Sequence, residues 1–431
     1  MTQPVAYTDI HSLPGPEDIL RKVLPNGITI LTRSNFNSPS VVLTGYIAAG
    51  SYLDPLEQLG LAHFTASALT RGTKTQTFQQ IFDRLESAGA SLGFGASVHN
   101  TSFSGRSLVE DLPLLIDLLA DCLRRPTFPE EYVKRLQVQF LTSLSIRAQD
   151  TAEMAAITFD ELLFGNHPYG RPEDGFIETI QKITRADLVR FHQQYYHPQN
   201  LVIVVVGAVE AQSVFDVIKA ALGDWQNPAK VQSAELAEII PPTQTIRRHL
   251  DIPGKSQTDL IMGMLGPKRK SPDYLIASLG NNVLGQFGMM GRIGAAVREK
   301  AGLAYDASTS LNAWIDGGSW EVSAGVNPVN LQKAIDLILQ ELHTFIQEPV
   351  SADELSDSQA NYIGRLPLSL ESNAGVANSI LNLERFDLGL DYLQRYAQII
   401  QTVTPEAILE VARKYVHPDN LVIVSAGSKN E

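Results

Sequence analysis

The spacing of apolar residues along this chain changes repeatedly between a period of two and a period near 3.6. Short runs rich in β-branched residues predict strands, and longer stretches with apolar residues three or four positions apart predict helices. Pro25-Asn26-Gly27 followed by an apolar run predicts a tight β-hairpin. The predicted strands are 28–32, 41–49, 91–98, 101–108, 201–207, 245–251, 259–265, 320–326 and 421–425. The predicted helices are 59–71, 77–88, 112–123, 129–146, 151–164, one opening at Thr184, 273–284, 292–300, 330–347, 352–366, 393–402 and 405–415.

An internal repeat divides this pattern in two. The segment YYHPQNLVIVVVG at 195–207 recurs as YVHPDNLVIVSAG at 415–427, an offset of 220 residues. Self-similarity at one long spacing indicates two copies of one domain. We therefore expect an extended arm at 1–20, a first α+β domain at 21–227, a linker at 228–244 and a second, homologous domain at 245–431.

Composition narrows the class of protein. A chain of 431 residues with 44% hydrophobic and 19% charged residues can form packed cores throughout. Its net charge of −13 argues against nucleic acid as a partner, because binding phosphates needs clustered Lys and Arg. The single Cys122 permits no intrachain disulfide. No secretion signal and no membrane span are apparent in the sequence, so we expect a cytoplasmic protein.

The stretch LGLAHFTASALTRGT at 59–73 carries the first functional signal. Its frame resembles the zinc-binding helix of the pitrilysin, insulysin and mitochondrial processing peptidase family, which has His-x-x-Glu-His there. This chain has His63 at the first ligand position, but Ala66 at the Glu position and Ser67 at the second His position. The HPYGRPEDG segment at 167–175 is also typical of that family.

The resemblance implies that this chain holds no zinc of its own. A catalytic zinc needs three protein ligands and a carboxylate to take the proton from its water. Ala66 cannot act as a base and Ser67 is a poor zinc ligand. The family's third ligand, a later Glu, falls near Ser143, within a run at 132–149 that contains no Asp or Glu. We therefore interpret His63 as a structural histidine and expect zinc only in a partner subunit.

A second signature lies at 285–308, GQFGMMGRIGAAVREKAGLAYDAS. Its glycines follow a predicted helix rather than a strand, which disfavours a phosphate-binding loop. Arg298 to Tyr305 resembles the Arg-Glu-x-x-Gly-Leu-x-Tyr signature of the same family. The resemblance implies that the Tyr305 hydroxyl stabilises the oxygen of a tetrahedral intermediate and that Arg298 binds a neighbouring peptide carbonyl. The alternative is that both side chains only pack.

Together these features are typical of the family's non-catalytic subunit. The implied fold is two tandem processing-peptidase-like domains, each an antiparallel sheet packed against helices. The implied partner is a homologous zinc-bearing subunit, and the implied substrate is an unfolded peptide added to a sheet edge. Two alternatives stay open: an inert structural or assembly subunit, as in the core proteins of respiratory complexes, and a homodimer that binds peptides without cleaving them.

Overall fold

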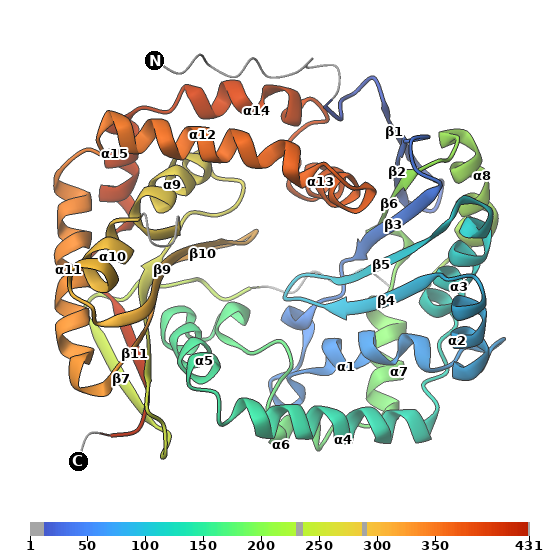
Figure 1. The fold of residues 1–431 in the computed structure, drawn as a ribbon. Coiled ribbons are helices and arrows are strands. Elements are labelled where there is room, and N and C mark those ends of the chain that lie inside the picture. The colour runs from blue at the N-terminus through green and yellow to red at the C-terminus, as the bar shows by residue number, and fades with distance from the viewer. Residues whose placement is uncertain (1–12, 230–235, 287–290, 430–431) are drawn as a thin grey trace. The chain divides into compact units, whose positions relative to one another are not determined.

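The computed structural model describes residues 13–229, 236–286 and 291–429, and its contacts divide the chain into two compact units (Figure 1). Unit 1 comprises Met1–Ser143, Pro172–Glu235 and Leu366–Tyr396. Unit 2 comprises Leu144–Arg171, Leu236–Arg365 and Ala397–Glu431. Each unit contains one sheet packed with helices, so the predicted α+β class is confirmed.

The sheet of unit 1 has six strands in the order β1-β2-β6-β3-β5-β4. All neighbours are antiparallel except β2 and β6, which are parallel. The predicted hairpin is present: Gly27 has a φ of +92°, a left-handed turn that glycine adopts easily, and β1 pairs with β2. The strands are β1 (Ile19–Val23), β2 (Thr29–Ser34), β3 (Ser40–Ile47), β4 (Ser91–Ala96), β5 (Thr101–Leu108) and β6 (Leu201–Gly207).

The sheet of unit 2 has five strands in the order β7-β11-β8-β10-β9, which repeats the order of unit 1 without β1. The repeated sequence forms β6 in one sheet and β11 in the other. Each of these two strands is parallel to one neighbour and antiparallel to the other. The repeat therefore marks the same inner strand of two related sheets. The strands are β7 (Ile246–Asp251), β8 (Thr258–Leu265), β9 (Ala304–Ala313), β10 (Gly318–Val326) and β11 (Val422–Gly427).

Local polar contacts mark the starts of two helices in unit 1. Thr77 and Gln80 form a capping box at α2, and at α7 the Asp187 carboxylate accepts hydrogen bonds from the backbone N–H and the hydroxyl of Thr184. No helix within the described residues is both long and apolar enough to cross a membrane. The helices are α1 (Leu61–Ala68), α2 (Phe78–Ser87), α3 (Leu112–Arg124), α4 (Glu130–Arg147), α5 (Thr151–Phe164), α6 (Ile177–Ile180), α7 (Arg185–Tyr195), α8 (Ala211–Leu222), α9 (Asp273–Asn281), α10 (Arg292–Gly294), α11 (Leu331–Gln347), α12 (Ala352–Ser369), α13 (Asn373–Phe386), α14 (Tyr392–Gln401) and α15 (Pro405–Tyr415).

The two halves of the sequence exchange helices. Helix α5, from the first half, packs on β8 and β11 in unit 2, whereas α13, from the second half, packs on β3 and β6 in unit 1. Val376, Ala377 and Ile380 of α13 join Val204 and Val206 of β6 in one buried apolar cluster. Because β6 is buried at every position, its sequence is a continuous apolar run rather than an alternating one. The domain bounds expected from the sequence place 144–171 in the first domain and 366–396 in the second. By their contacts, 144–171 belongs to unit 2 and 366–396 to unit 1.

Several elements differ from the sequence-based prediction. Helices α6, α8 and α13 have no counterpart in that prediction. The predicted helices 273–284 and 292–300 are present, but they end in π-helical turns at Asn282–Gln286 and Ala295–Lys300. Part of the glycine-rich stretch between them, 287–290, lies outside the described residues, as do 230–235 of the predicted linker. The predicted strand 91–98 ends at Ala96.

An ion pair in unit 2 gives a pH-dependent prediction. Arg292 donates Nε and Nη2 to the two carboxylate oxygens of Glu354, at 2.7 and 2.8 Å, and this pairing lowers the pKa of Glu354 to about 2. Because the folded pKa lies below the unfolded value, the pair stabilises the fold above pH 4.5, and the contribution disappears as the pH falls towards 2. Glu354→Gln should cost about 1–2 kcal/mol of unfolding free energy at pH 7, discounted for partial exposure.

Urea unfolding of parent and variant at pH 7 and near pH 3 measures this difference. We expect it to shrink at the lower pH. Glu410→Gln, at an exposed position on α15, is the matched control and should show no difference at either pH. A difference of equal size at both pH values would contradict the assignment.

Candidate functional site

Helix α1, which carries the degenerate motif positions, is fixed by a buried carboxylate. Asp54 is 4% exposed and accepts hydrogen bonds from the backbone N–H groups of Gly60 and Ala62, each at 2.9 Å. Negative charge at this end also suits the helix dipole. Gly60 has a φ of +95°, and a Cβ there would lie 2.7 Å from the Ile180 side chain, so a larger residue would not fit. The glycine of the motif therefore serves the entry into α1.

The motif positions lie on a largely buried helix. Ala66 is buried and Ser67 is half-buried. The ring of His63 packs edge-on against Phe140 of α4, with ring centroids 5.1 Å apart, and burial lowers its pKa, so the imidazole is neutral at pH 7. Within the described residues, no group of three or more His, Cys, Asp or Glu side chains is arranged to hold a metal ion.

Arg298 and Tyr305 lie together in unit 2. Arg298 belongs to the π-helical turn that ends at Lys300, and Tyr305 is the second residue of β9. Gly302 joins them with a φ of +63°, a left-handed conformation favoured by glycine, and its N–H donates to the Arg298 carbonyl at 3.0 Å. The Arg298 guanidinium lies over the Tyr305 ring, 5.6 Å from its centroid. The Gly-Leu of the signature thus makes the turn that brings Arg and Tyr together.

Tyr305 presents its hydroxyl to solvent. Its side chain is 85% exposed, and the hydroxyl has no hydrogen-bond partner within the described part of the chain. The Tyr305 O–H is therefore free to donate to a bound molecule.

A cavity of about 340 Å³ adjoins Tyr305 within unit 2. Its walls come from α5, β8, β9 and β10, and three small residues, Ala152, Ala155 and Ala156, open it on the helix side. Asp259 lines it from β8 and accepts hydrogen bonds from Thr151 and Gln257. The sequence prediction did not include this cavity. Its only trace in the sequence is the helically spaced alanines in TAEMAAIT at 151–158.

The HPYGRPEDG segment has a structural role around its aromatic residues. Tyr169 is 4% exposed, packs against Trp314 with ring centroids 4.8 Å apart, and accepts a hydrogen bond from the backbone N–H of Asp316 at 3.0 Å. His167 is buried, and its Nδ1 accepts from the Tyr169 N–H at 3.2 Å. These contacts engage the Tyr169 hydroxyl and the His167 Nδ1 in hydrogen bonds within the protein.

Comparison with known proteins gives consistent matches. The family model described as "Insulinase (Peptidase family M16)" matches residues 29–163. The model described as "Peptidase M16 inactive domain" matches residues 182–362. A protein of Streptomyces coelicolor, named an uncharacterized zinc protease, is 26% identical over 92% of this chain and 86% of its own length. The mitochondrial-processing peptidase subunit beta of Saccharomyces cerevisiae is 24% identical over 83% of this chain and 80% of its own length.

Solved structures match over nearly the whole chain. The peptidase M16 inactive domain from Pseudomonas fluorescens superposes with a TM-score of 0.89 and 26% identity, covering 96% of this chain and 98% of its own. A protease from Helicobacter pylori superposes with a TM-score of 0.85, covering 96% and 100%, and at 21% identity it shares the fold.

Proposed function

Because this chain belongs to the M16 (insulinase) peptidase family and is a homologue of zinc proteases, we propose that it is the non-catalytic subunit of a heterodimeric zinc metallopeptidase. The observation that carries the proposal is a contrast between two sites. The motif helix lacks side chains that suit zinc, whereas Arg298 and Tyr305 lie together with the tyrosine hydroxyl free to donate.

The residues around His63 do not fit a zinc ion. The methyl group of Ala66 offers no base, the hydroxyl of Ser67 offers a weak ligand, and the apolar ring of Phe140 packs edge-on against the imidazole. Three carboxylate or imidazole groups would be needed, and His63 is the only one of the motif's ligand positions that has one. We therefore assign no hydrolytic step to this chain alone and expect zinc in its partner.

Arg298 and Tyr305 would act on the peptide bound by the partner. A positioned O–H that donates to the oxygen of a tetrahedral intermediate stabilises it by about 3 kcal/mol, because the charge develops only in the transition state. The guanidinium of Arg298 would hold a neighbouring peptide carbonyl and, by lying over the ring, keep Tyr305 in position. Tyr305 would thus donate a hydrogen bond to the intermediate, and Arg298 would bind the peptide and orient Tyr305.

The sheet of unit 1 offers a place for an extended peptide. Strand β4 is the last in its sheet, so its outer backbone N–H and C=O groups are available for pairing. Addition of a peptide strand along β4 would bind many sequences through backbone hydrogen bonds. This supports an unfolded peptide as substrate.

A mixing experiment tests the proposal. Cleavage of a quenched peptide should be absent with this chain alone, low with a homologous subunit carrying His-x-x-Glu-His alone, and restored when the two are combined. The reason is that zinc chemistry and oxyanion stabilisation would reside on different chains. If the zinc-bearing subunit alone cleaved the peptide as fast as the mixture, the proposal would be wrong.

A further inference from the structure

Tyr305 occupies a β-bulge at the start of β9, the last strand in the sheet of unit 2. Val326 of β10 lies opposite Ala304 of β9. The residue before it, Gly325, lies opposite Asp306, so Tyr305 has no partner in the ladder. An extra, unpaired residue bends its strand and redirects a side chain. The bulge on an edge strand explains the high exposure of Tyr305, which borders the cavity of about 340 Å³.

Two carboxylates flank Gly325 within this cavity. Gly325 lies opposite Asp259 of β8 and opposite Asp306 of β9, so the three residues form one row across the sheet. Directly opposed residues project from the same face of a sheet, and both aspartates line the cavity. Because neighbouring strands are about 4.8 Å apart, the two aspartate Cα atoms are about 10 Å apart. Glycine contributes no side chain between them, and we call this row of three residues the acidic notch.

A nitrogen donor already lies in the acidic notch. A Cβ added to Gly325 would lie 2.5 Å from Nε2 of Gln257, so the Gln257 amide covers the glycine. The same Nε2 donates a hydrogen bond to Oδ1 of Asp259 at 2.7 Å. Because the Gln257 side chain is exposed, a ligand can displace it without disturbing the core. The notch therefore has room for a planar group whose N–H donates to Asp259.

The acidic notch has a negative charge that the cavity does not neutralise. Among the described residues that line the cavity, Asp259 and Asp306 are acidic and none is basic, since Arg298 does not line it. Asp259 accepts hydrogen bonds from the neutral side chains of Thr151 and Gln257. Neither aspartate forms an ion pair within the described part of the chain. The uncompensated charge favours a cationic ligand.

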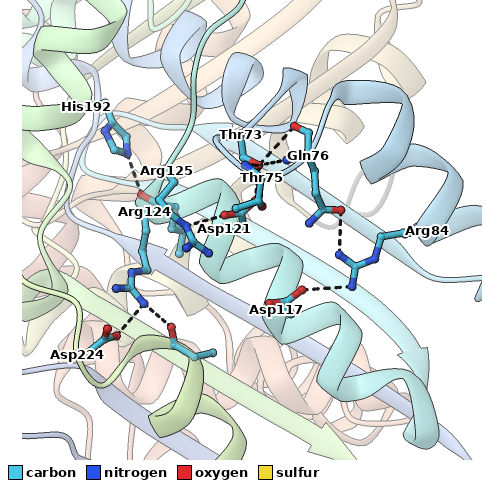
Figure 2. Close-up of polar contacts among 12 residues, drawn as sticks. Thr73, Thr75, Gln76, Arg84, Asp117, Asp121, Arg124, Arg125, His192 and Asp224 are labelled. Carbon is cyan, nitrogen blue, oxygen red and sulfur yellow. Dashed lines mark hydrogen bonds and ion pairs between the residues drawn. The ribbon is translucent and has the colours of Figure 1, made fainter.

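Two carboxylates of unit 1 are, by contrast, paired with arginines (Figure 2). Asp121, which is 1% exposed, lies 2.7 Å from Nε of Arg125. Asp224 lies 2.8 Å from Nη1 of Arg124. Guanidinium groups suit carboxylates because their N–H groups lie in one plane and donate in more than one direction. In the acidic notch, a ligand would have to supply the corresponding cation.

The other residues that line the cavity are small or apolar. They come from α5, β8 and β10 and comprise Ala152, Ala155, Ala156, Leu260, Ile261, Ser323 and Ala324. Long cationic side chains bury a methylene stem against apolar surface and keep the charged end in a polar environment. An apolar wall beside two carboxylates therefore suits a side chain of this kind.

We propose that the cavity binds an arginine side chain of the peptide, at a residue near the bond that is cleaved, an inference that rests on the proposed function. The methylene stem would pack on the alanines of α5, and the guanidinium would replace the Gln257 amide. Its N–H groups on opposite edges can contact Asp259 and Asp306 at once. A lysine ammonium has all its donors on one nitrogen and would contact one carboxylate of a pair this far apart. Because Tyr305 borders the same cavity, the bound residue would lie close to its hydroxyl.

Binding of labelled peptides to the full chain, measured by fluorescence polarisation, tests this pocket. The peptides are fluorescein-labelled Ala-Ala-Arg-Ala-Ala and its analogues with citrulline or lysine in place of arginine. Citrulline keeps the shape of arginine without the charge. We expect the arginine peptide to bind about tenfold tighter than the citrulline peptide and about threefold tighter than the lysine peptide. Strand addition along β4 would not produce this difference, because it uses the peptide backbone.

Asp306→Asn should weaken binding of the arginine peptide about tenfold and leave that of the citrulline peptide unchanged. The variant should fold like the parent, because the Asp306 side chain is exposed and forms no hydrogen bond or ion pair within the described residues. Asp306→Glu keeps the carboxylate and should keep most of the preference for arginine. Asp357→Asn is the matched control, since it removes an equal charge from an exposed position of α12 in the same unit and should change neither affinity.

Three results would overturn the proposal: equal affinity of the parent for the arginine and citrulline peptides, equal affinity of the Asp306→Asn and Asp357→Asn variants for the arginine peptide, or no binding of that peptide up to about 1 mM. A lysine peptide that bound as tightly as the arginine peptide would overturn the contact with both carboxylates. Since the measurement needs neither a zinc-bearing subunit nor cleavage, it can fail while the mixing experiment succeeds, and the reverse.

Discussion

Replacing Tyr305 with phenylalanine is expected to lower the kcat of the mixed pair about a hundredfold and to change KM little. The substitution removes one oxygen atom, and an oxyanion donor acts mainly in the transition state, where its loss costs about 3 kcal/mol. The folded state should not change, because the side chain is 85% exposed and its hydroxyl has no partner within the described residues. Steady-state kinetics on a quenched peptide measures both constants.

Tyr274→Phe is a matched control for this experiment. Tyr274 lies in the same unit, and its ring also has an arginine above it, Arg269, at 4.1 Å from the centroid. Losing that hydroxyl should leave kcat unchanged. If the Tyr305 variant supported full activity in a pair that still needed both chains, Tyr305 would have no catalytic role and the chain would act as an assembly subunit.

The sequence predicts local structure best where a segment carries its own apolar pattern, either a helical spacing or an unbroken apolar run. Helix α5 at 151–164 and strand β6 at 201–207 match their predicted bounds. Helix α13 was missed because Asn373, Gly375, Asn378 and Ser379 are weak helix formers. Its stability comes instead from packing Val376, Ile380 and Leu383 into the cluster around β6. That partner lies about 170 residues earlier in the chain, so no local pattern could reveal it.

The candidate site likewise has one part that a local motif predicts and one part that depends on residues distant in sequence. The signature from Arg298 to Tyr305 is a local motif, and its turn at Gly302 brings both ends together. The cavity beside Tyr305 has walls from Ala152 to Gly325, and it exists only because α5 packs on the sheet of unit 2. A cavity in unit 1 is likewise lined by Lys74, Arg125 and Trp225, which are distant in sequence. A site whose residues come from distant parts of the chain cannot be predicted from local sequence patterns, and only the structure reveals it.

Ile380→Ala should destabilise unit 1 by about 3 kcal/mol. Ile380 is fully buried in the cluster that joins α13 to the sheet, and truncating a buried isoleucine loses its transfer free energy and leaves a cavity. Hydrogen exchange of the β6 amides should then be about a hundredfold faster, since their protection follows the unfolding free energy of the sheet. Asn382→Ala, at an exposed position of α13, is the control and should leave these amides unchanged.

The same measurement decides whether α13 is an integral part of unit 1. If β6 exchanged at the parental rate in Ile380→Ala, the helix would be an accessory, and the remaining parts of unit 1 would hold their sheet without it. We expect the opposite, because Leu31, Val202, Val204 and Val206 would otherwise expose one apolar face of the sheet to water. The sheet that ends in β4, the proposed peptide-binding strand, would then depend for its stability on a helix encoded near the end of the chain.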